Sequence, residues 1–466
     1  MRLILFLVFT GLFLITGAQQ REEASDNSAF WTTIKKSMPQ YKKVFRKHKD
    51  YRLELIVTRI DRDQTNHPVK LTRYHYGDSS TYFYPASTVK LPVAIFTMEK
   101  IWSLYKGATT ESLIEFSPVK FCNDHVYENN YHLYQRLTES ETLRQLADRL
   151  HIPVQFLKSV NPGLPVDTLI AANSSIRISA QKSPLSFRDL LSSMLVYSDN
   201  ESFNKLFDVV GIDYINQRLQ ECNFSSSRIV RRLMYCPDTS RFIGPDFRIL
   251  TSDSSSVLLK ERSRGRVMAE NLELKGTVVG KKHMEGEAVL KGGRDFSNHN
   301  FVSLSDLHEM MIRLVFHDML PKNEQFRMGK FEQRFLLRLL GNHPREITRM
   351  RTNQYDYLED GYTNFLLNGD SKDPIPNRYR IINIAGWANG FTTDVAYVMD
   401  MQSNTEFFIS ARIYTNKNKV IGDDTYEYST IARPFMQAFG QSVLDIERNR
   451  SKEFLPNLIV IGGIFK

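Results

Sequence analysis

Residues 84–94 read YPASTVKLPVA, and this stretch leads into a long apolar run, Leu91–Tyr105. The run is long enough to predict a buried helix. Ser87 stands at the expected start of that helix, at the positive end of its dipole, and Lys90 follows three positions later. Residues three apart lie on one helix face. The stretch therefore predicts that the Ser87 hydroxyl and the Lys90 amine are neighbours.

This pairing suggests nucleophilic chemistry. An amine with a lowered pKa can take the proton of a serine hydroxyl and turn it into a nucleophile that can be acylated. The alternative is an N-cap serine followed by a solvent-exposed lysine. A second Ser-x-x-Lys, Ser117 to Lys120, lacks the helix start that distinguishes Ser87.

The triplet Ser198-Asp199-Asn200 lies between two predicted helices, 186–196 and 200–210. At such a junction side chains can project into a cleft, although an Asx-type helix start is the alternative interpretation. Ser-x-x-Lys and Ser-Asp-Asn are the first two of three elements typical of class A β-lactamases and penicillin-binding proteins.

Longer segments of the chain also resemble the class A enzymes. Residues 84–94, residues 195–206 and Gly211–Leu219 are similar to the corresponding segments of class A enzymes. The resemblance implies that Ser87 attacks a β-lactam or acyl-D-alanine carbonyl and that Lys90 takes its proton. It also implies that Ser198 relays a proton to the leaving nitrogen and that Asn200 orients the substrate.

The third element, Lys-Thr-Gly, is incomplete. Aligned through Gly386-Trp387, the segment 383–386 puts Ile384 at the lysine position and Ala385 at the threonine position. Gly386 is retained, and the resemblance implies an oxyanion hole formed by the backbone N–H groups of Ser87 and Trp387. The residues that would receive a substrate carboxylate are missing, unless Arg378 or Arg380 reaches the cleft.

The ω-loop pattern Glu-x-x-x-Asn of the class A enzymes has no clear match. Residues 233–237 read LMYCP, with Met234 and Tyr235 where a carboxylate is expected. Without a base for the hydrolytic water, we expect a long-lived acyl-enzyme, unless Asp238 or Glu201 supplies the base.

Residues 133–179 have a resemblance of their own. Their predicted strand–helix–helix–strand order resembles a LysM module, a small fold that binds N-acetylglucosamine-containing glycans, with Ser140 and Glu141 in place of its usual glycine and aspartate. The resemblance implies binding to peptidoglycan. The alternative is a helical hairpin with no glycan site.

Composition excludes several classes of protein. The 466 residues are 42% hydrophobic, 24% charged and 12% aromatic, which is typical of a globular protein and unlike disordered or multi-span membrane chains. The net charge of +9 is dispersed rather than gathered in basic blocks, so we expect no nucleic-acid partner. The motifs call for no cofactor and no metal. The cysteines, Cys122, Cys222 and Cys236, permit one disulfide but no disulfide-built scaffold.

The N-terminal residues have the pattern of a secretory signal peptide. A short apolar run, Leu3–Ile15, precedes the small residues Gly17 and Ala18, so cleavage is expected near Ala18. This predicts a secreted or periplasmic protein of the bacterial cell envelope with no stable membrane span after cleavage; a retained N-terminal anchor is the alternative.

Strands predicted near both ends, with helices between them, favour an α+β fold whose chain ends share one antiparallel sheet. The prediction is a β-lactamase-like fold with an all-helical subdomain and a βααβ LysM-like insertion. The expected division is a signal peptide at 1–18, a hydrolase domain at 28–132 and 180–447, the module at 133–179, an irregular insertion at 237–300 and a tail at 448–466. The predicted function is an exported serine hydrolase of β-lactamase type. The alternative is a non-catalytic peptidoglycan-binding protein that acts through the module.

Overall fold

The protein is described by a computed structural model. It describes residues 20–465 except 104, 106, 117–119, 123–124, 127–129, 138, 151–152, 173, 183–184, 234–246, 252–255, 260–271, 273, 344 and 347–358. The expected signal peptide and the second Ser-x-x-Lys serine, Ser117, lie outside the described residues.

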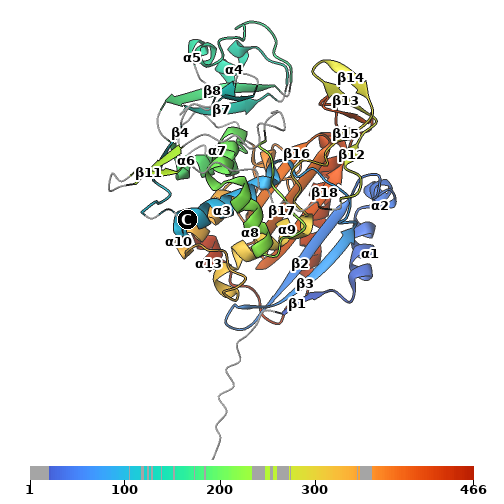
Figure 1. Cartoon of the computed structure of the whole chain (residues 1–466). Helices are drawn as coiled ribbons and strands as arrows, with labels where there is room; N and C mark the ends of the chain where they lie inside the picture. The colour runs from blue at the N-terminus through green and yellow to red at the C-terminus, as the bar shows by residue number, and fades with distance from the viewer. Residues whose placement is uncertain are drawn as a thin grey trace, which may run out of the picture.

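A six-stranded sheet forms the centre of the fold, in the order β1-β3-β2-β18-β17-β16. Its strands are β1 (Gln20–Glu23), β2 (Glu54–Arg62), β3 (Pro68–Gly77), β16 (Tyr379–Ala388), β17 (Phe391–Asp400) and β18 (Thr405–Tyr414). All neighbours are antiparallel except β1, which runs parallel to β3. Because β2 pairs with β18, the two ends of the chain meet in one sheet, as the sequence predicts (Figure 1).

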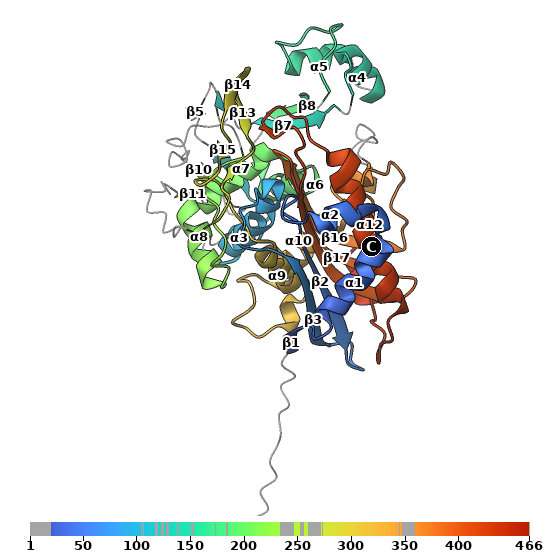
Figure 2. The same cartoon turned by 90° about the vertical axis from the view of Figure 1, so that its right-hand side faces the viewer.

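Helices cover both faces of this sheet (Figure 2). On one face α1 (Asn27–Ser37) and α12 (Arg433–Asn449) pack into one hydrophobic cluster with the sheet. The other face carries the larger cluster and a helical subdomain. Its helices are α3 (Lys90–Ser103), α6 (Phe187–Val196), α7 (Asn200–Val210), α8 (Ile212–Glu221), α9 (Leu304–Val315) and α10 (Lys330–Gly341).

In the sequence, residues 28–48 carry an apolar stripe, Phe30, Ile34, Met38, Tyr41 and Phe45, whose spacing predicts one surface helix, but the structure breaks it. Helix α1 ends at Ser37, and a short 3-10 turn, Pro39–Tyr41, separates it from α2 (Lys42–Arg46). Met38 has φ −121° and ψ 54°, because a residue before proline is driven out of the helical region.

The inserted unit at the top of Figure 1 has the predicted order of elements. It consists of β7 (Asn130–Arg136), α4 (Leu143–Leu150), α5 (Val154–Val160) and β8 (Ser175–Lys182), with β7 antiparallel to β8. Leu143, Leu146, Leu157 and Ile176 belong to a hydrophobic cluster separate from the two main ones. Its identity as a LysM module remains a prediction.

The stretch 237–300, expected to be irregular, contains short strands in its described parts. These are β10 (Phe247–Leu250), β11 (Ser256–Leu259), β12 (Val278–Val279), β13 (Lys282–Glu285), β14 (Ala288–Lys291) and β15 (Arg294–Asp295). Strand β10 pairs with β4 (Leu113–Phe116), more than 120 residues earlier in the chain. The prediction of irregular structure was wrong there because such pairing is not visible in local polarity.

The described chain has further short elements. These are β5 (Lys120–Cys122), β6 (His125–Val126), β9 (Leu185–Ser186), β19 (Val420–Ile421) and α13 (Ile459–Gly462). The tail is not free, since Leu458 is buried and Phe465 lies against Gly341 of α10. Cys222 is a buried free thiol. None of the helices in the described ranges combines the length and hydropathy that crossing a membrane requires.

Candidate active site

Ser87 lies in a tight turn rather than at the helix start. The turn is a 3-10 helix, Ala86–Val89, and α3 begins only at Lys90. Both the amide and the hydroxyl of Thr88 donate to the carbonyl of Pro85, at 3.1 and 2.7 Å, and so hold the turn closed. Ala86 adopts a φ of +48°, which is uncommon for a residue with a side chain and clusters at functional sites.

The edge strand β16 passes directly beside this turn. A Cβ atom placed on Gly386 would lie 2.6 Å from the backbone nitrogen of Ser87 and 3.0 Å from that of Thr88. Real Cβ contacts are essentially never that short, so only glycine allows the strand to come this close. Gly386, a predicted substrate-binding residue, therefore sets the distance between the strand and the serine.

The amine of Lys90 is the centre of the site. The side chain is fully buried, and Nζ lies 2.8 Å from Ser87 Oγ, 2.9 Å from Ser198 Oγ and 2.8 Å from Asn200 Oδ1. The Ser198 carbonyl oxygen lies 2.6 Å from the same nitrogen. The Ser198 hydroxyl also donates to Ser87 Oγ, at 2.9 Å. The structure thus brings together all four residues that the two motifs single out.

The charge state of Lys90 follows from its burial. Burial lowers its pKa to about 7, although the nearby Asp199 carboxylate opposes the shift. Four oxygens lie within 2.9 Å of Nζ, so the amine is surrounded by hydrogen-bond partners. In its neutral form the lone pair of the amine can accept the proton of a serine hydroxyl.

The junction between α6 and α7 presents Ser198 and Asn200. Asp199 is the N-cap of α7 and accepts the backbone N–H of Ser202 at 2.6 Å. Ser198 has a φ of +54°, a conformation that only surrounding structure makes tolerable. The Asx-type helix start and the functional interpretation therefore both hold: Asp199 caps the helix, and its two neighbours face Lys90.

Other predicted groups do not reach the serine. Arg378 makes an ion pair with Asp400 at 2.6 Å, and Arg380 pairs with Glu346 at 2.7 Å. Arg378 lies just before β16 and Arg380 lies within it, both six or more residues before Gly386. The expectation that one of them substitutes for the missing lysine finds no support in these contacts.

The ring of Trp387 packs among other aromatic side chains. The indole packs edge to face against Phe365 and Tyr362, and the guanidinium of Arg433 lies 4.8 Å from the centre of a Trp387 ring. The side chain thus belongs to the cluster on the α12 face of the sheet.

The described part of the segment expected to hold a deacylation base ends at Leu233. Its backbone N–H donates to Asn204 Oδ1 at 2.8 Å. Met234, Tyr235 and Asp238 lie outside the described residues. Glu201 is described, and its Oε1 pairs with the Lys205 amine at 2.9 Å.

Sequence reasoning missed the strained backbone at Ala86 and Ser198. No local signal predicts it, because alanine and serine rarely have positive φ. It did not foresee the role of Asn204 as an anchor for Leu233 either, since the two are 29 positions apart.

We expect the reactivity of Ser87 to depend on the protonation of Lys90. Labelling by a fluorophosphonate should rise with pH through about 7, where Lys90 loses its proton, and then level off. Lys90→Arg should abolish labelling because arginine stays protonated. Rates measured by intact mass between pH 5 and 9 check this, and a rate that still climbs steeply above pH 8 would contradict it.

Gly386→Ala should displace the turn that carries Ser87. The added methyl meets backbone atoms of Ser87 and Thr88, which cannot rotate away, and a displacement of about 1 Å can cost about 10²-fold in rate. Gly463→Ala is the matched control, because nothing lies within 4 Å of its Cβ position. Labelling rates of the two variants, with thermal melts to verify folding, provide the measurement; equal rates would refute the close approach.

Comparison with known proteins identifies one family. The beta-lactamase enzyme family (Beta-lactamase2) matches residues 167–439, a stretch that includes Ser198, Asn200 and Gly386 and begins after Ser87 and Lys90. A search of curated proteins gives no match.

Solved structures are similar at low identity. A class A beta-lactamase from Bacteroides cellulosilyticus is 11% identical with a TM-score of 0.41, over 88% of this chain and 99% of that one. A beta-lactamase from Sphaerobacter thermophilus is 10% identical with a TM-score of 0.43, over 90% and 99%. The protein PBP-A is 12% identical with a TM-score of 0.43, over 92% and 99%.

The family assignment rests on the sequence match, which extends over more than half of the chain. On that ground, this chain belongs to the beta-lactamase enzyme family.

Proposed function

We propose that this protein is an exported serine hydrolase that is acylated at Ser87 by β-lactams or by acyl-D-alanyl peptides. One observation carries the proposal: a fully buried Lys90 amine lies 2.8 Å from the Ser87 hydroxyl, with its pKa lowered to about 7. An amine poised near neutrality is suited to take a hydroxyl proton at physiological pH. A capping serine beside a solvent-exposed lysine would need none of these features.

In this proposal each contact of the site has a role in acylation. Ser87 Oγ attacks the carbonyl carbon while Lys90 accepts the hydroxyl proton. Ser198 Oγ, 2.9 Å from both Nζ and Ser87 Oγ, passes a proton to the nitrogen of the leaving group. Asn200 holds the amine in place through Oδ1 and offers its amide to the substrate.

The backbone N–H groups of Ser87 and Trp387 form the oxyanion hole in this proposal. The close approach that Gly386 permits supports it, because it brings β16 against the turn. Each such donor is worth about 3–4 kcal/mol of the barrier.

Hydrolysis of the acyl-enzyme is slow in this proposal. Deacylation needs a carboxylate that holds a water, and the sequence offers no match to the Glu-x-x-x-Asn pattern. Glu201, one of the alternatives, is engaged by Lys205. General-base assistance is worth about 10²–10⁴ in rate, so its loss makes deacylation the slow step.

The cell envelope is the proposed site of action. The signal-like segment at 1–18 supports export, and peptidoglycan peptides with acyl-D-alanyl ends are found in that compartment. Peptidoglycan is also the proposed partner of the inserted unit.

Glycan binding by residues 133–179 is a second candidate function. The βααβ order and the separate hydrophobic cluster of this unit favour it, since both are compatible with a small independent module. If Ser87 proves unreactive, a non-catalytic peptidoglycan-binding protein becomes the better description.

Incubation with a fluorescent penicillin should add one label, and peptide mapping should place it on Ser87. Ser87→Ala should lose the label, whereas Ser117→Ala should keep it. With a chromogenic cephalosporin, stopped-flow hydrolysis should show a burst equal to the enzyme concentration and then slow turnover. Fast hydrolysis without a burst would show that an efficient base exists.

The full chain should sediment with insoluble peptidoglycan or chitin, and soluble N-acetylglucosamine oligomers should compete. Ser87→Ala is the control, because a glycan site in residues 133–179 is independent of the nucleophile. Binding that Ser87→Ala or prior acylation abolishes would assign the interaction to the hydrolase site. No sedimentation would leave the unit without a glycan role.

A further inference from the structure

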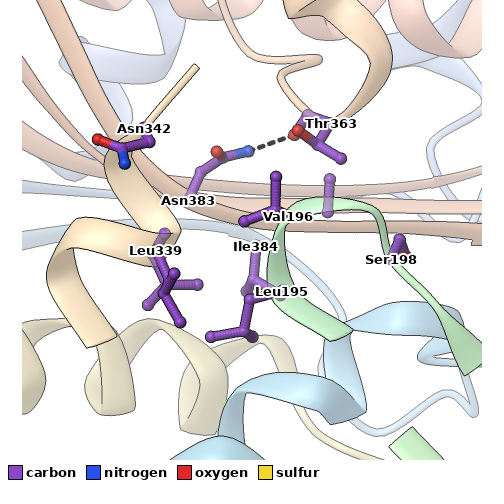
Figure 3. Close-up of a pocket in the computed structure, with 10 residues that line it drawn as sticks. Leu195, Val196, Ser198, Leu339, Asn342, Thr363, Asn383 and Ile384 are labelled. Carbon is purple, nitrogen blue, oxygen red and sulfur yellow. Dashed lines mark hydrogen bonds between the residues drawn. The ribbon is translucent and has the colours of Figure 1, made fainter. Parts of the chain in front are cut away.

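A narrow pocket lies directly beside Ser198, between the end of α6, helix α10 and the strand β16 (Figure 3). Six of its ten lining residues are apolar, Ile384 and Leu339 among them, and the other four are Ser198, Asn342, Thr363 and Asn383. In Figure 3 Ile384 lies between Leu339 and the loop that carries Ser198. Ser198 therefore belongs both to the catalytic contacts and to the wall of this pocket.

None of the ten lining residues carries a charge. The amide of Asn383 is also fully used, since its two protons go to the carbonyl of Thr363 at 2.5 Å and to Asp394 Oδ1 at 2.9 Å. The described wall of this pocket therefore has no positive charge that could bind an anion. The amide of Asn383 is not free to bind one either.

The two arginines that the sequence offers in place of the missing lysine are occupied. Arg378 and Arg380 make ion pairs with Asp400 and Glu346. Lys90 is enclosed by four oxygens and has to lose its proton to act as a base. A carboxylate brought against this wall would find no opposite charge among the described residues that line it.

The uncharged wall affects the reaction because the leaving group of any acyl substrate has to lie next to Ser198, which protonates it. Burying an unpaired charge costs far more than burying a neutral group of the same shape. The wall of the pocket should therefore discriminate between leaving groups according to their charge.

We propose that this site prefers acyl substrates whose leaving group is uncharged over those that carry a carboxylate beside the scissile bond, with Ile384 as the residue that sets the preference. The inference rests on the proposed function, because it assumes that Ser87 is acylated. In the step itself the Ser87 Oγ–carbonyl carbon bond forms and the β-lactam carbon–nitrogen bond breaks. The Ser87 proton passes to Lys90, and the nitrogen receives a proton through Ser198.

Benzylpenicillin and its methyl ester test this directly. They share the acyl group and the ring, and they differ in charge only at the carboxylate. Rates of Ser87 acylation, measured by intact mass at several ligand concentrations, should be at least about tenfold higher per unit concentration for the ester.

Ile384→Lys should remove the preference for the ester. A lysine at this position puts an amine beside Ser198, so acylation by benzylpenicillin should rise at least about tenfold while the ester gains nothing. Ile384→Met is the matched control, since it is long and flexible but neutral, and it should keep the preference of the unchanged protein. Thermal melts verify that each variant is folded.

The outcomes separate the two claims. A tenfold preference of the unchanged protein for benzylpenicillin, or equal rates for both ligands, overturns this inference and leaves the proposed function standing. Labelling by neither ligand overturns the proposed function and the inference with it. Should Ile384→Lys fail to fold, the two ligands on the unchanged protein and on Ile384→Met still decide the question.

Discussion

The buried amine of Lys90 is the interaction on which the rest of the site depends. It connects the turn that carries Ser87 to the helix junction that carries Ser198 and Asn200, two segments more than 100 residues apart. Burial keeps the amine near neutrality, and the four surrounding oxygens hold it in position. A permanently charged lysine would be costly in this setting, and burial accordingly lowers the pKa of Lys90 to about 7.

The sheet supplies the second constraint. Strands from both chain ends make one surface, and its edge strand β16 lies against the nucleophile turn only because residue 386 has no side chain. The helical subdomain packs on the same face and holds the Ser198 junction over the turn. Backbone strain at Ala86 and Ser198 is located where these layers meet, and the packing of the layers maintains it.

Charge is distributed unevenly around this centre. The described arginines near the start of β16 form ion pairs away from Ser87, and the pocket behind Ser198 is neutral. The described chain thus gathers Lys90, Ser198 and Asn200 around Ser87 and places no charged side chain in the lining of the adjacent pocket. This division links the family assignment to a narrower question about substrate charge.

The sequence by itself determined the local features: the Ser87 and Lys90 spacing, the Ser198-Asp199-Asn200 junction and the strands at both chain ends. These follow from periodicity and from residue types that act within a few positions. Only the tertiary structure decided that Ser87 lies in a 3-10 turn before α3, and that β10 pairs with β4 in a stretch that looks irregular. It also decided that Arg378 and Arg380 are held by Asp400 and Glu346. Partners chosen across tens or hundreds of residues depend on packing and on long-range ion pairs, which no local pattern records.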